Sequence, residues 1–290
     1  MQYLKGKSSL PGSGIIFEIT SSSKLIIMKN KLLIIALLST TLFTDSCSEG
    51  GGINLFSIED DKALGAQVAA EIEADPATYP LLDENTYSEA YDLLNDIRDR
   101  ILNSGEVAHA DDFVWELHII HNDDVVNAFC TPGGYIYVYT GLIKYLDDEA
   151  QLACVLGHEM AHADLRHTTD QLTEIYGISL LLSIVLGSDQ QLLGDIATTL
   201  ASLAFSRDDE SQADEYSVIF VCPTDYYAAA SAEFFEKIEA EGGAEVPEFL
   251  STHPSPENRI EDILAKYETL GCNGTARYTS RYQDLIDALP

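Results

Sequence analysis

Two histidines four residues apart, His158 and His162, enclose a glutamate in residues 157–162 (GHEMAH). On a helix, residues four apart lie one turn apart on the same face. Both imidazoles can therefore reach one metal ion, and zinc is the ion that this pattern usually holds. Glu159 is then placed to take a proton from a water molecule at the metal. The alternative is a surface helix that carries two histidines by chance, so the motif needs support from elsewhere in the chain.

A catalytic zinc site needs a third protein ligand and one position left for water. The metzincin solution requires glycine at position 165 and histidine at position 168, and the chain has Leu165 and Thr168 instead. A carboxylate from a later helix is the other solution. Glu210 and Asp214, in residues 206–214 (SRDDESQAD), are four apart and face the same way on a helix. Glu210 can bind the metal while Asp214 orients a ligand histidine, although an acidic, solvated helix face would look similar.

Hydrophobic periodicity predicts the elements that position these residues. Apolar residues at helical spacing indicate helices over residues 58–73 and 88–102. Strands are expected over residues 113–120, 127–131 and 135–139, the last two separated by a Pro-Gly-Gly turn. We expect a small antiparallel sheet just before the metal helix. That helix is predicted to begin after Asp147 or Asp148 and to run to about His167.

The remaining histidines of this region lack partners at ligand spacing. His118 and His121 fall in or beside the first predicted strand, and we expect them to be structural or to face solvent. His167 follows His162 by five residues, which places it off the ligand face of a helix, so we interpret it as non-ligating.

Residues 176–186 form a strongly apolar segment that could suggest a membrane helix. The segment is only about half as long as a span requires, and residues 187–189 (GSD) end it. We therefore predict a buried or cleft-lining helix there, followed by another over residues 190–205. An exposed apolar hairpin that docks on a membrane or a substrate is the alternative.

The acidity of the chain limits its partners. Its 290 residues are enough for one large domain, and 48 acidic against 16 basic residues give a net charge of −32. Five of the basic residues but only two of the acidic ones precede Cys47, so the imbalance is stronger in the rest of the chain. Such a surface repels nucleic acid and anionic membranes. Solubility is the simplest reading of this acidity, and a preference for basic substrates is the alternative.

The amino-terminal region has the layout of a secretory signal. Residues 28–31 (MKNK) are basic, residues 32–38 (LLIIALL) are apolar, and small residues lead to Cys47 and a glycine-rich tether. This layout is similar to a bacterial lipoprotein signal, although Asp45 departs from the usual residue two before the cysteine. We expect residues 1–46 to be a signal region that starts at Met28, Cys47 to be the lipid anchor, and residues 47–57 to be a tether. A genuine extension before Met28 or a signal-anchor helix is the alternative.

Four cysteines follow Cys47, and an even number in an exported chain permits disulfides. Cys154 lies one turn before His158 on an apolar face, so we expect it to be buried and free. Cys222 and Cys272 each follow a helical segment, and we prefer them as a disulfide pair.

Four segments together resemble one family of zinc peptidases. They are residues 127–134 (NAFCTPGG), 157–162, 206–214 and 251–260 (STHPSPENRI). Their order and combination resemble the HtpX, Oma and CAAX-prenyl-protease-type zinc metallopeptidases, which are gluzincins with H-E-x-x-H and a later E-x-x-A-D. The resemblance implies an α+β fold over residues 58–290, a mostly helical zincin-like domain with a small antiparallel sheet and an edge strand beside the HExxH helix.

The same resemblance implies the roles of individual residues. His158, His162 and Glu210 would bind one zinc ion, and Glu159 would act as the general base. Asp214 would orient a ligand histidine. The other implied roles are electrostatic support of the site by Arg207, pairing with substrate by Asn127, Ala128 and Phe129, and capping of the zinc or stabilisation of the oxyanion by His253. A turn residue before Pro254 is the alternative for His253, and Cys130-Thr131 replace the family's usual aliphatic residue, which leaves the subsite preference open.

The expected function is zinc-dependent hydrolysis of peptide bonds in unfolded or damaged proteins of a bacterial envelope, as protein quality control. The expected partners are polypeptide substrates and, through the lipid anchor, the periplasmic or outer membrane. One alternative is a zinc-containing chaperone or binding lipoprotein without hydrolysis. The other is a latent peptidase, restrained by His253 or by helices over residues 168–205. The sequence leaves the oligomeric state and the natural substrate open.

Overall fold

The structure, a computed structural model, describes residues 56–187, 192–243 and 246–290. The expected signal region, Cys47 and most of the tether lie outside the described residues. The described part is mostly helical and contains a small sheet, which confirms the α+β class. None of the described helices is both long and apolar enough to cross a membrane.

The first two helices match the sequence pattern. Helix α2 (Ile58–Ala74) is capped by Ser57, whose hydroxyl accepts a hydrogen bond from the Asp60 backbone N–H while the Asp60 carboxylate accepts one from the Ser57 N–H. This reciprocal capping satisfies two amide groups that a helix start leaves without partners. Helix α3 (Ser88–Leu102) turns Leu94, Ile97 and Ile101 into the core.

The sheet is mixed, so the expectation of a fully antiparallel sheet is wrong. Strands β2 (Ala128–Thr131) and β3 (Tyr135–Tyr139) form the expected antiparallel hairpin. Strand β1 (Glu116–Ile120) pairs with β3 in parallel, in the order β1-β3-β2. A hairpin has two free edges, and β1 adds to that of β3, which puts β3 in the centre of the sheet. The remaining free edge of the hairpin belongs to β2, as expected.

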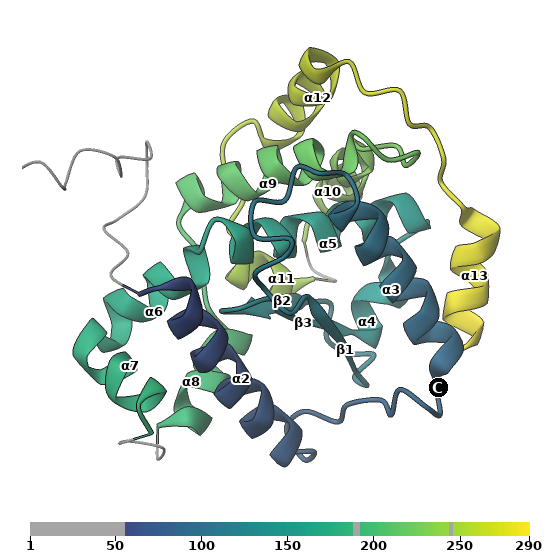
Figure 1. Cartoon of the computed structure of the whole chain (residues 1–290). Helices are drawn as coiled ribbons and strands as arrows, with labels where there is room; N and C mark the ends of the chain where they lie inside the picture. The colour runs from purple at the N-terminus through teal and green to yellow at the C-terminus, as the bar shows by residue number, and fades with distance from the viewer. Residues whose placement is uncertain (1–55, 188–191, 244–245) are drawn as a thin grey trace, which may run out of the picture. The chain divides into compact units, whose positions relative to one another are not determined.

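Helix α5 (Glu149–Asp164) occupies the centre of the described domain, and all its residues are buried. The Asp148 carboxylate accepts a hydrogen bond from the Gln151 N–H and so caps the start of the helix. Helix α5 packs against α9 (Arg207–Val221), α10 (Ala230–Ala240) and β2. In Figure 1, α9 lies above α5 and the sheet lies below it.

One glycine of α5 brings the neighbouring helix α9 close. A Cβ atom at Gly157 would lie 3.1 Å from the Ser217 hydroxyl oxygen and 3.3 Å from a methyl carbon of Val221, both on α9. A larger residue would push α9 outward. Gly157 therefore sets the separation of the two helices that carry the metal-binding motifs.

Helix α5 ends earlier than predicted, in a left-handed turn. Arg166 has a φ of 65°, which costs a non-glycine residue about 1 kcal/mol. Its guanidinium donates to the buried Asp61 carboxylate at 2.6 Å and to the Phe56 carbonyl at 2.6 Å. These bonds offset the cost, and the chain turns into α6 (His167–Tyr176).

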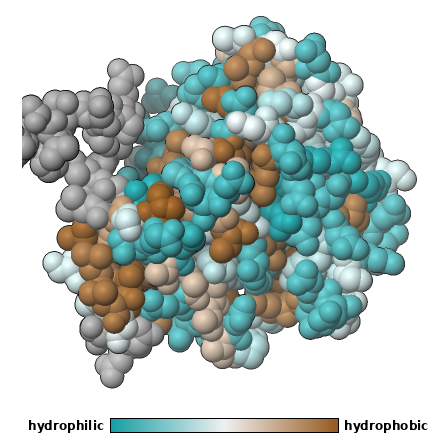
Figure 2. Space-filling view, viewed as in Figure 1, coloured by the Kyte–Doolittle hydropathy of each residue, from teal (hydrophilic) through white to brown (hydrophobic). Residues whose placement is uncertain are grey.

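Two short apolar helices follow α6 and form a second core with α2. They are α7 (Ile178–Val185) and α8 (Leu193–Ala201). Leu181 and Ile184 of α7 are fully buried, whereas Ile175 and Leu186 at its flanks are 53% and 78% exposed. The prediction of a buried helix thus holds for one face of α7. Figure 2 shows hydrophobic residues gathered at the lower left, where Figure 1 places α7.

The carboxy-terminal part consists of α11 (Pro247–Thr252), α12 (Arg259–Leu270), the short connection after it and α13 (Thr279–Asp287). A disulfide joins Cys222, at the end of α9, to Cys272, just after α12. This confirms the expected pair. Cys130 and Cys154 are free and buried, as expected for Cys154.

Candidate metal centre and active site

The two histidines of α5 meet as the i, i+4 spacing predicts. Nε2 of His158 lies 3.1 Å from Nε2 of His162, and both side chains are buried. The helix is held on all sides, so neither ring needs to be ordered when a metal binds.

Helix α9 delivers the carboxylate. Its start is fixed by a capping box between Ser206 and Asp209. The Glu210 carboxylate, fully buried, then lies 3.2 Å from Nε2 of His162 and 3.5 Å from Nε2 of His158. The carboxylate expected from a later helix therefore reaches the two histidines.

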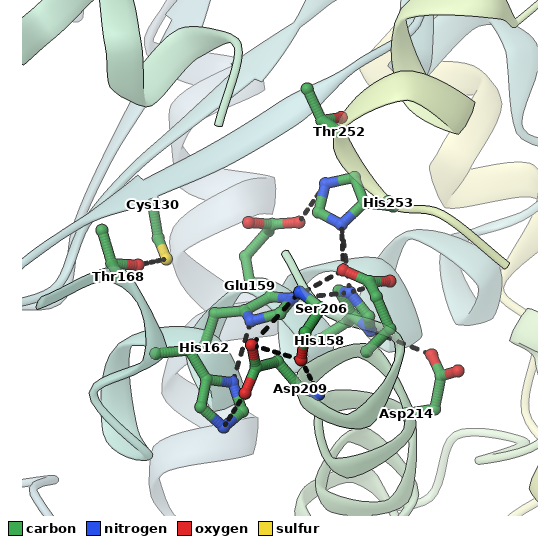
Figure 3. A network of polar contacts seen from close by, with 12 residues as sticks. Cys130, His158, Glu159, His162, Thr168, Ser206, Asp209, Asp214, Thr252 and His253 are labelled. Atoms are coloured by element: carbon green, nitrogen blue, oxygen red, sulfur yellow. Dashed lines mark hydrogen bonds and ion pairs between the residues drawn. The ribbon is translucent and has the colours of Figure 1, made fainter. Parts of the chain in front are cut away.

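His253 is a fourth member of this cluster. It follows the last residue of α11, is 1% exposed, and places Nδ1 3.0 Å from Glu210 Oε1 and 3.3 Å from His158 Nε2. Of the two alternatives that the sequence left open, the structure favours the position beside the metal ligands. Figure 3 shows Glu159 and His253 side by side above the two histidines of α5.

The four groups fit a zinc ion in geometry and in chemistry. Five separations between their donor atoms range from 3.0 to 3.5 Å. Donors held about 2.0–2.1 Å from an ion at tetrahedral angles lie about 3.3 Å from one another. Imidazole and carboxylate are ligands that zinc prefers. These residues therefore form a site of the right size and donor type for one tetrahedral metal ion.

Asp214 and Arg259 surround the ligands. The Asp214 carboxylate lies 3.0 Å from Nδ1 of His158, the ring nitrogen that faces away from the cluster. The Arg259 guanidinium donates to Asp214 at 2.7 Å and to Glu210 at 3.0 Å. One buried arginine thus contacts both acidic residues of the E-x-x-A-D segment and offsets part of their negative charge.

Arg207, the arginine expected to support the site, is exposed at the first turn of α9. Side chains on a helix lean towards its amino terminus, so a residue in the first turn leans off the end of the helix. The arginine that contacts the acidic residues of the site is Arg259, and the supporting role of Arg207 stays a prediction. Arg259 stands six residues after His253 in residues 251–260, the segment that carried the resemblance, and its place there was the available signal.

Burial and neighbouring charges shift the pKa values of the ligands. Burial alone would lower the pKa of His158, but Glu210 and Asp214 outweigh it and raise the pKa to about 10. Burial lowers the pKa of His162 well below its usual value, which keeps that ring neutral. Burial alone would raise the pKa of Glu210, but His253 and His158 lower it well below the usual range. Glu210 is therefore an anion, the form that binds a cation.

Glu159 differs from the other acidic residues of the site. It is fully buried, and neither of its carboxylate oxygens has a hydrogen-bond partner among the described residues. His253 Nε2 is 3.5 Å from Oε1, too far for a strong hydrogen bond. Burial raises the pKa of Glu159. An unpartnered carboxylate with a raised pKa beside a metal cluster is suited to accept and return a proton.

His167 and Phe205 also contact the cluster, although the sequence pattern indicated neither. The Phe205 ring stacks on the His162 ring, with ring centroids 3.7 Å apart. Nδ1 of His167 lies 3.0 Å from Nδ1 of His162. As expected, His167 does not join the donor cluster. It contacts His162 at Nδ1, the ring nitrogen that faces away from the cluster. His118 lies 3.2 Å from Glu116 on β1 and outside this site.

The residues expected to pair with substrate are buried. Asn127, Ala128 and Phe129 are 2%, 0% and 4% exposed, and helices α6 and α8 pack against β2. The Asn127 side-chain oxygen accepts a hydrogen bond from the Thr252 hydroxyl at 3.1 Å, which links β2 to the end of α11 beside His253. Strand β2 is an edge of the sheet, but other elements cover it.

The cluster, its buried acid and the helices that carry them define a metallopeptidase fold. Residues 92–266 match the model of Peptidase family M48, and the chain belongs to this family. The matched segment includes every residue of the cluster. The expected resemblance to Oma- and HtpX-type metallopeptidases is thereby confirmed.

The chain is also similar to two named proteases. The chain is 32% identical over 163 residues to the mitochondrial metalloendopeptidase OMA1 of Arabidopsis thaliana, covering 55% of this chain and 33% of the relative. It is 31% identical over 217 residues to the beta-barrel assembly-enhancing protease of Escherichia coli, covering 62% of this chain and 44% of the relative. The matches thus span a third to under half of these relatives' own lengths.

Proposed function

We propose that the chain is a zinc-dependent metalloendopeptidase that hydrolyses peptide bonds in unfolded or damaged proteins of a bacterial envelope. The observation that carries this proposal is the pairing of the donor cluster with Glu159. Glu159 is buried without a hydrogen-bond partner among the described residues, next to His158 in the chain. Burying an unpaired carboxylate is costly, and the cost is understandable where the group moves protons.

Three residues hold the metal in this proposal, and the chemistry follows from their number. His158, His162 and Glu210 would bind zinc and leave one position for water and substrate. When bound, zinc supplies a Lewis acid that polarises the peptide carbonyl and makes water more acidic. Asp214 accepts the Nδ1 proton of His158 and so holds Nε2 towards the metal.

Glu159 performs the proton transfers. One carboxylate oxygen takes a proton from the attacking water as the water oxygen bonds to the carbonyl carbon. The same carboxyl group then donates this proton to the leaving nitrogen as the C–N bond breaks. The raised pKa of Glu159 suits both steps, because the group must hold the proton between them.

The substrate in this proposal is an extended polypeptide. The edge of β2 at Asn127, Ala128 and Phe129 would pair with it through main-chain hydrogen bonds, which accept many sequences. Unfolded chains offer such segments and folded proteins do not. Because the residues of β2 are buried, some of the elements that pack against it have to shift before a peptide pairs there.

A latent state of the same peptidase is the second candidate. His253 Nδ1 lies within 3.3 Å of donor atoms of both Glu210 and His158, at the position that a catalytic site keeps for water. A site with four protein ligands has the composition of a structural zinc site. In this candidate, His253 has to leave before hydrolysis begins.

The cellular location rests on the sequence. We propose that residues 1–46 are a signal region, in which Met28 is the true start, and that Cys47 carries lipid. Residues 47–57 then tether a domain of residues 58–290 to the membrane. The disulfide between Cys222 and Cys272 supports export, because such bonds persist in oxidising compartments. The E. coli relative, the beta-barrel assembly-enhancing protease, comes from a bacterium with such an envelope.

Cleavage of unfolded casein tests the proposal. We expect the wild type to lose activity with a chelator and to regain it with zinc. Glu159→Gln should keep bound zinc and lose about 10²–10⁴-fold in turnover, the range for removal of a general base. Undiminished cleavage by Glu159→Gln would refute the role of Glu159. A wild type that binds zinc and unfolded protein but never cleaves would favour the chaperone or binding lipoprotein instead.

Substrates in the envelope can be found with the same variant. Cells that express Glu159→Gln should accumulate the proteins that the wild type removes, and these should be envelope proteins. Accumulation of cytoplasmic proteins alone would contradict the proposed location.

A further inference from the structure

The Nδ1 atoms of the two histidines of α5, which face away from the donor cluster, contact different groups. Nδ1 of His158 faces the Asp214 carboxylate at 3.0 Å. Nδ1 of His162 faces no carboxylate but Nδ1 of His167, at 3.0 Å, and both rings are buried. We propose that His167 is a positioning residue that accepts the Nδ1 proton of His162 and thereby holds Nε2 of His162 on the metal. This rests on the proposed function in that it takes His162 as a zinc ligand.

The protons of the pair can be assigned. His162 points Nε2 at the cluster, so a metal-binding His162 carries its proton on Nδ1. Nδ1 of His167 must then be unprotonated, and His167 carries its own proton on Nε2. That nitrogen faces α9, where Asp209 Oδ1 lies 3.9 Å away.

The left-handed turn at Arg166 makes this contact possible. In a continuous helix, a residue five positions after His162 would point about 140° away from it. The φ of 65° at Arg166 breaks the helix, and His167 starts a new one that brings its ring back onto His162. The buried Asp61 locks the turn, since it accepts hydrogen bonds from Arg166 at 2.6 Å and from Thr169 at 2.9 Å.

A neutral acceptor suits this side of the site. Glu210, Glu159 and Asp214 already bring three carboxyl groups to the cluster, and Arg259 is the cation that contacts Glu210 and Asp214. A carboxylate behind His162 would add another buried negative charge without a partner. An imidazole fixes the ring orientation without that charge. His167 also links α5 to α9, because its two nitrogens face His162 and Asp209.

The test compares three substitutions of His167 by zinc affinity, measured by competition with a chelator in the full chain. His167→Leu removes the acceptor. In His167→Asn, the amide oxygen stands near the place of Nδ1, whereas in His167→Gln it stands near that of Nε2. We expect His167→Leu to bind zinc about 10–100-fold more weakly, the usual range for loss of such a partner. His167→Asn should stay within about threefold of wild type, and His167→Gln should resemble His167→Leu.

Controls separate this role from packing and from the proposed function. His121→Leu, at an exposed histidine, should bind zinc like wild type. The melting temperatures of the zinc-free proteins report packing alone. They should not be higher for His167→Asn than for His167→Gln, whereas the zinc affinity should be. If His167→Leu does not fold, the Asn–Gln comparison decides alone. Wild-type affinity in His167→Leu, or equal affinities in His167→Asn and His167→Gln, would overturn the proposal. A wild type without a bound zinc would instead refute the proposed function.

Discussion

Nδ1 of His253 lies 3.0 Å from Oε1 of Glu210, within the donor cluster rather than beside it. His253 comes from the end of α11, a six-residue helix, whereas the other three members come from the long helices α5 and α9. The Thr252 hydroxyl, next in the chain, holds Asn127 at the start of β2. The position of His253 is therefore linked to the start of the strand that is expected to pair with substrate.

We expect His253→Ala to raise the rate of casein cleavage. The substitution vacates one donor position and leaves His158, His162 and Glu210 to hold zinc. If the open form is about a tenth of the wild-type molecules, the gain is about tenfold. Initial rates at saturating zinc measure it, with His121→Ala as the matched histidine control. Unchanged or lower activity with zinc retained would show that His253 does not restrain the site and would favour a role for it in the reaction.

Arg259 is expected to be the most sensitive basic residue of the site. Arg259→Met keeps most of the side-chain volume but leaves Glu210 and Asp214 buried without their cation. Removing one partner of a buried ion pair costs about 3–5 kcal/mol, so we expect a loss of that size in the free energy of unfolding. Arg259→Lys should lose less, because it keeps the charge but not the two-pronged geometry. Urea unfolding of the zinc-free proteins measures both.

The control for Arg259 is the exposed Arg207. Arg207→Met should change the free energy of unfolding by no more than about 0.5 kcal/mol, as surface substitutions usually do. Equal losses in Arg207→Met and Arg259→Met would contradict the assignment of the supporting charge to Arg259.

Much of the donor cluster could be predicted from the sequence because local spacing brings its residues to one helix face. His158 and His162 are four apart on one helix, and Glu210 and Asp214 repeat that spacing on another. Their partners depend on tertiary structure. Arg259 reaches the site only because α12 packs against α9, and His167 does so only because Arg166 adopts a left-handed conformation without being glycine.

Hydrophobic periodicity predicted the helices and strands of the fold, but it did not predict how the strands pair. The helices at 58–73 and 88–102 and the hairpin across residues 132–134 match the structure closely. The direction of β1 depends on how residues 121–127 cross to the hairpin, and no period in the sequence encodes that path. The cover over β2 has the same origin, because α6 and α8 reach it through long-range packing.

The disulfide should stabilise the packing of α12, which carries Arg259, against α9, which carries Glu210 and Asp214. Cys222 and Cys272 close a loop over a sequence separation of 50 residues, from the end of α9 to just beyond α12. Replacing both with alanine should cost about 2–4 kcal/mol of unfolding free energy, because the unfolded chain gains freedom. Unfolding in urea with and without a reducing agent measures it. The reducing agent should weaken the wild type and leave the double variant unchanged, and an equal effect on both would contradict the prediction.

Removal of the metal should destabilise the domain, and Glu210 provides the matched control. Without a metal ion, the cluster brings a buried anion and several imidazoles together, and His158 carries a proton because Glu210 and Asp214 raise its pKa. A ligand at about 1,000 times its Kd adds about 4 kcal/mol to the stability of the folded state. For a domain of this size, that corresponds to a shift of roughly 10 °C in the melting temperature. Calorimetry with zinc and with a chelator should therefore give clearly different melting temperatures for the wild type.

Glu210→Gln loses the anionic ligand, so its melting temperatures with zinc and with a chelator should nearly coincide. A zinc-dependent shift of the same size in Glu210→Gln would mean that the stabilising ion binds elsewhere, and would remove Glu210 from the ligand set.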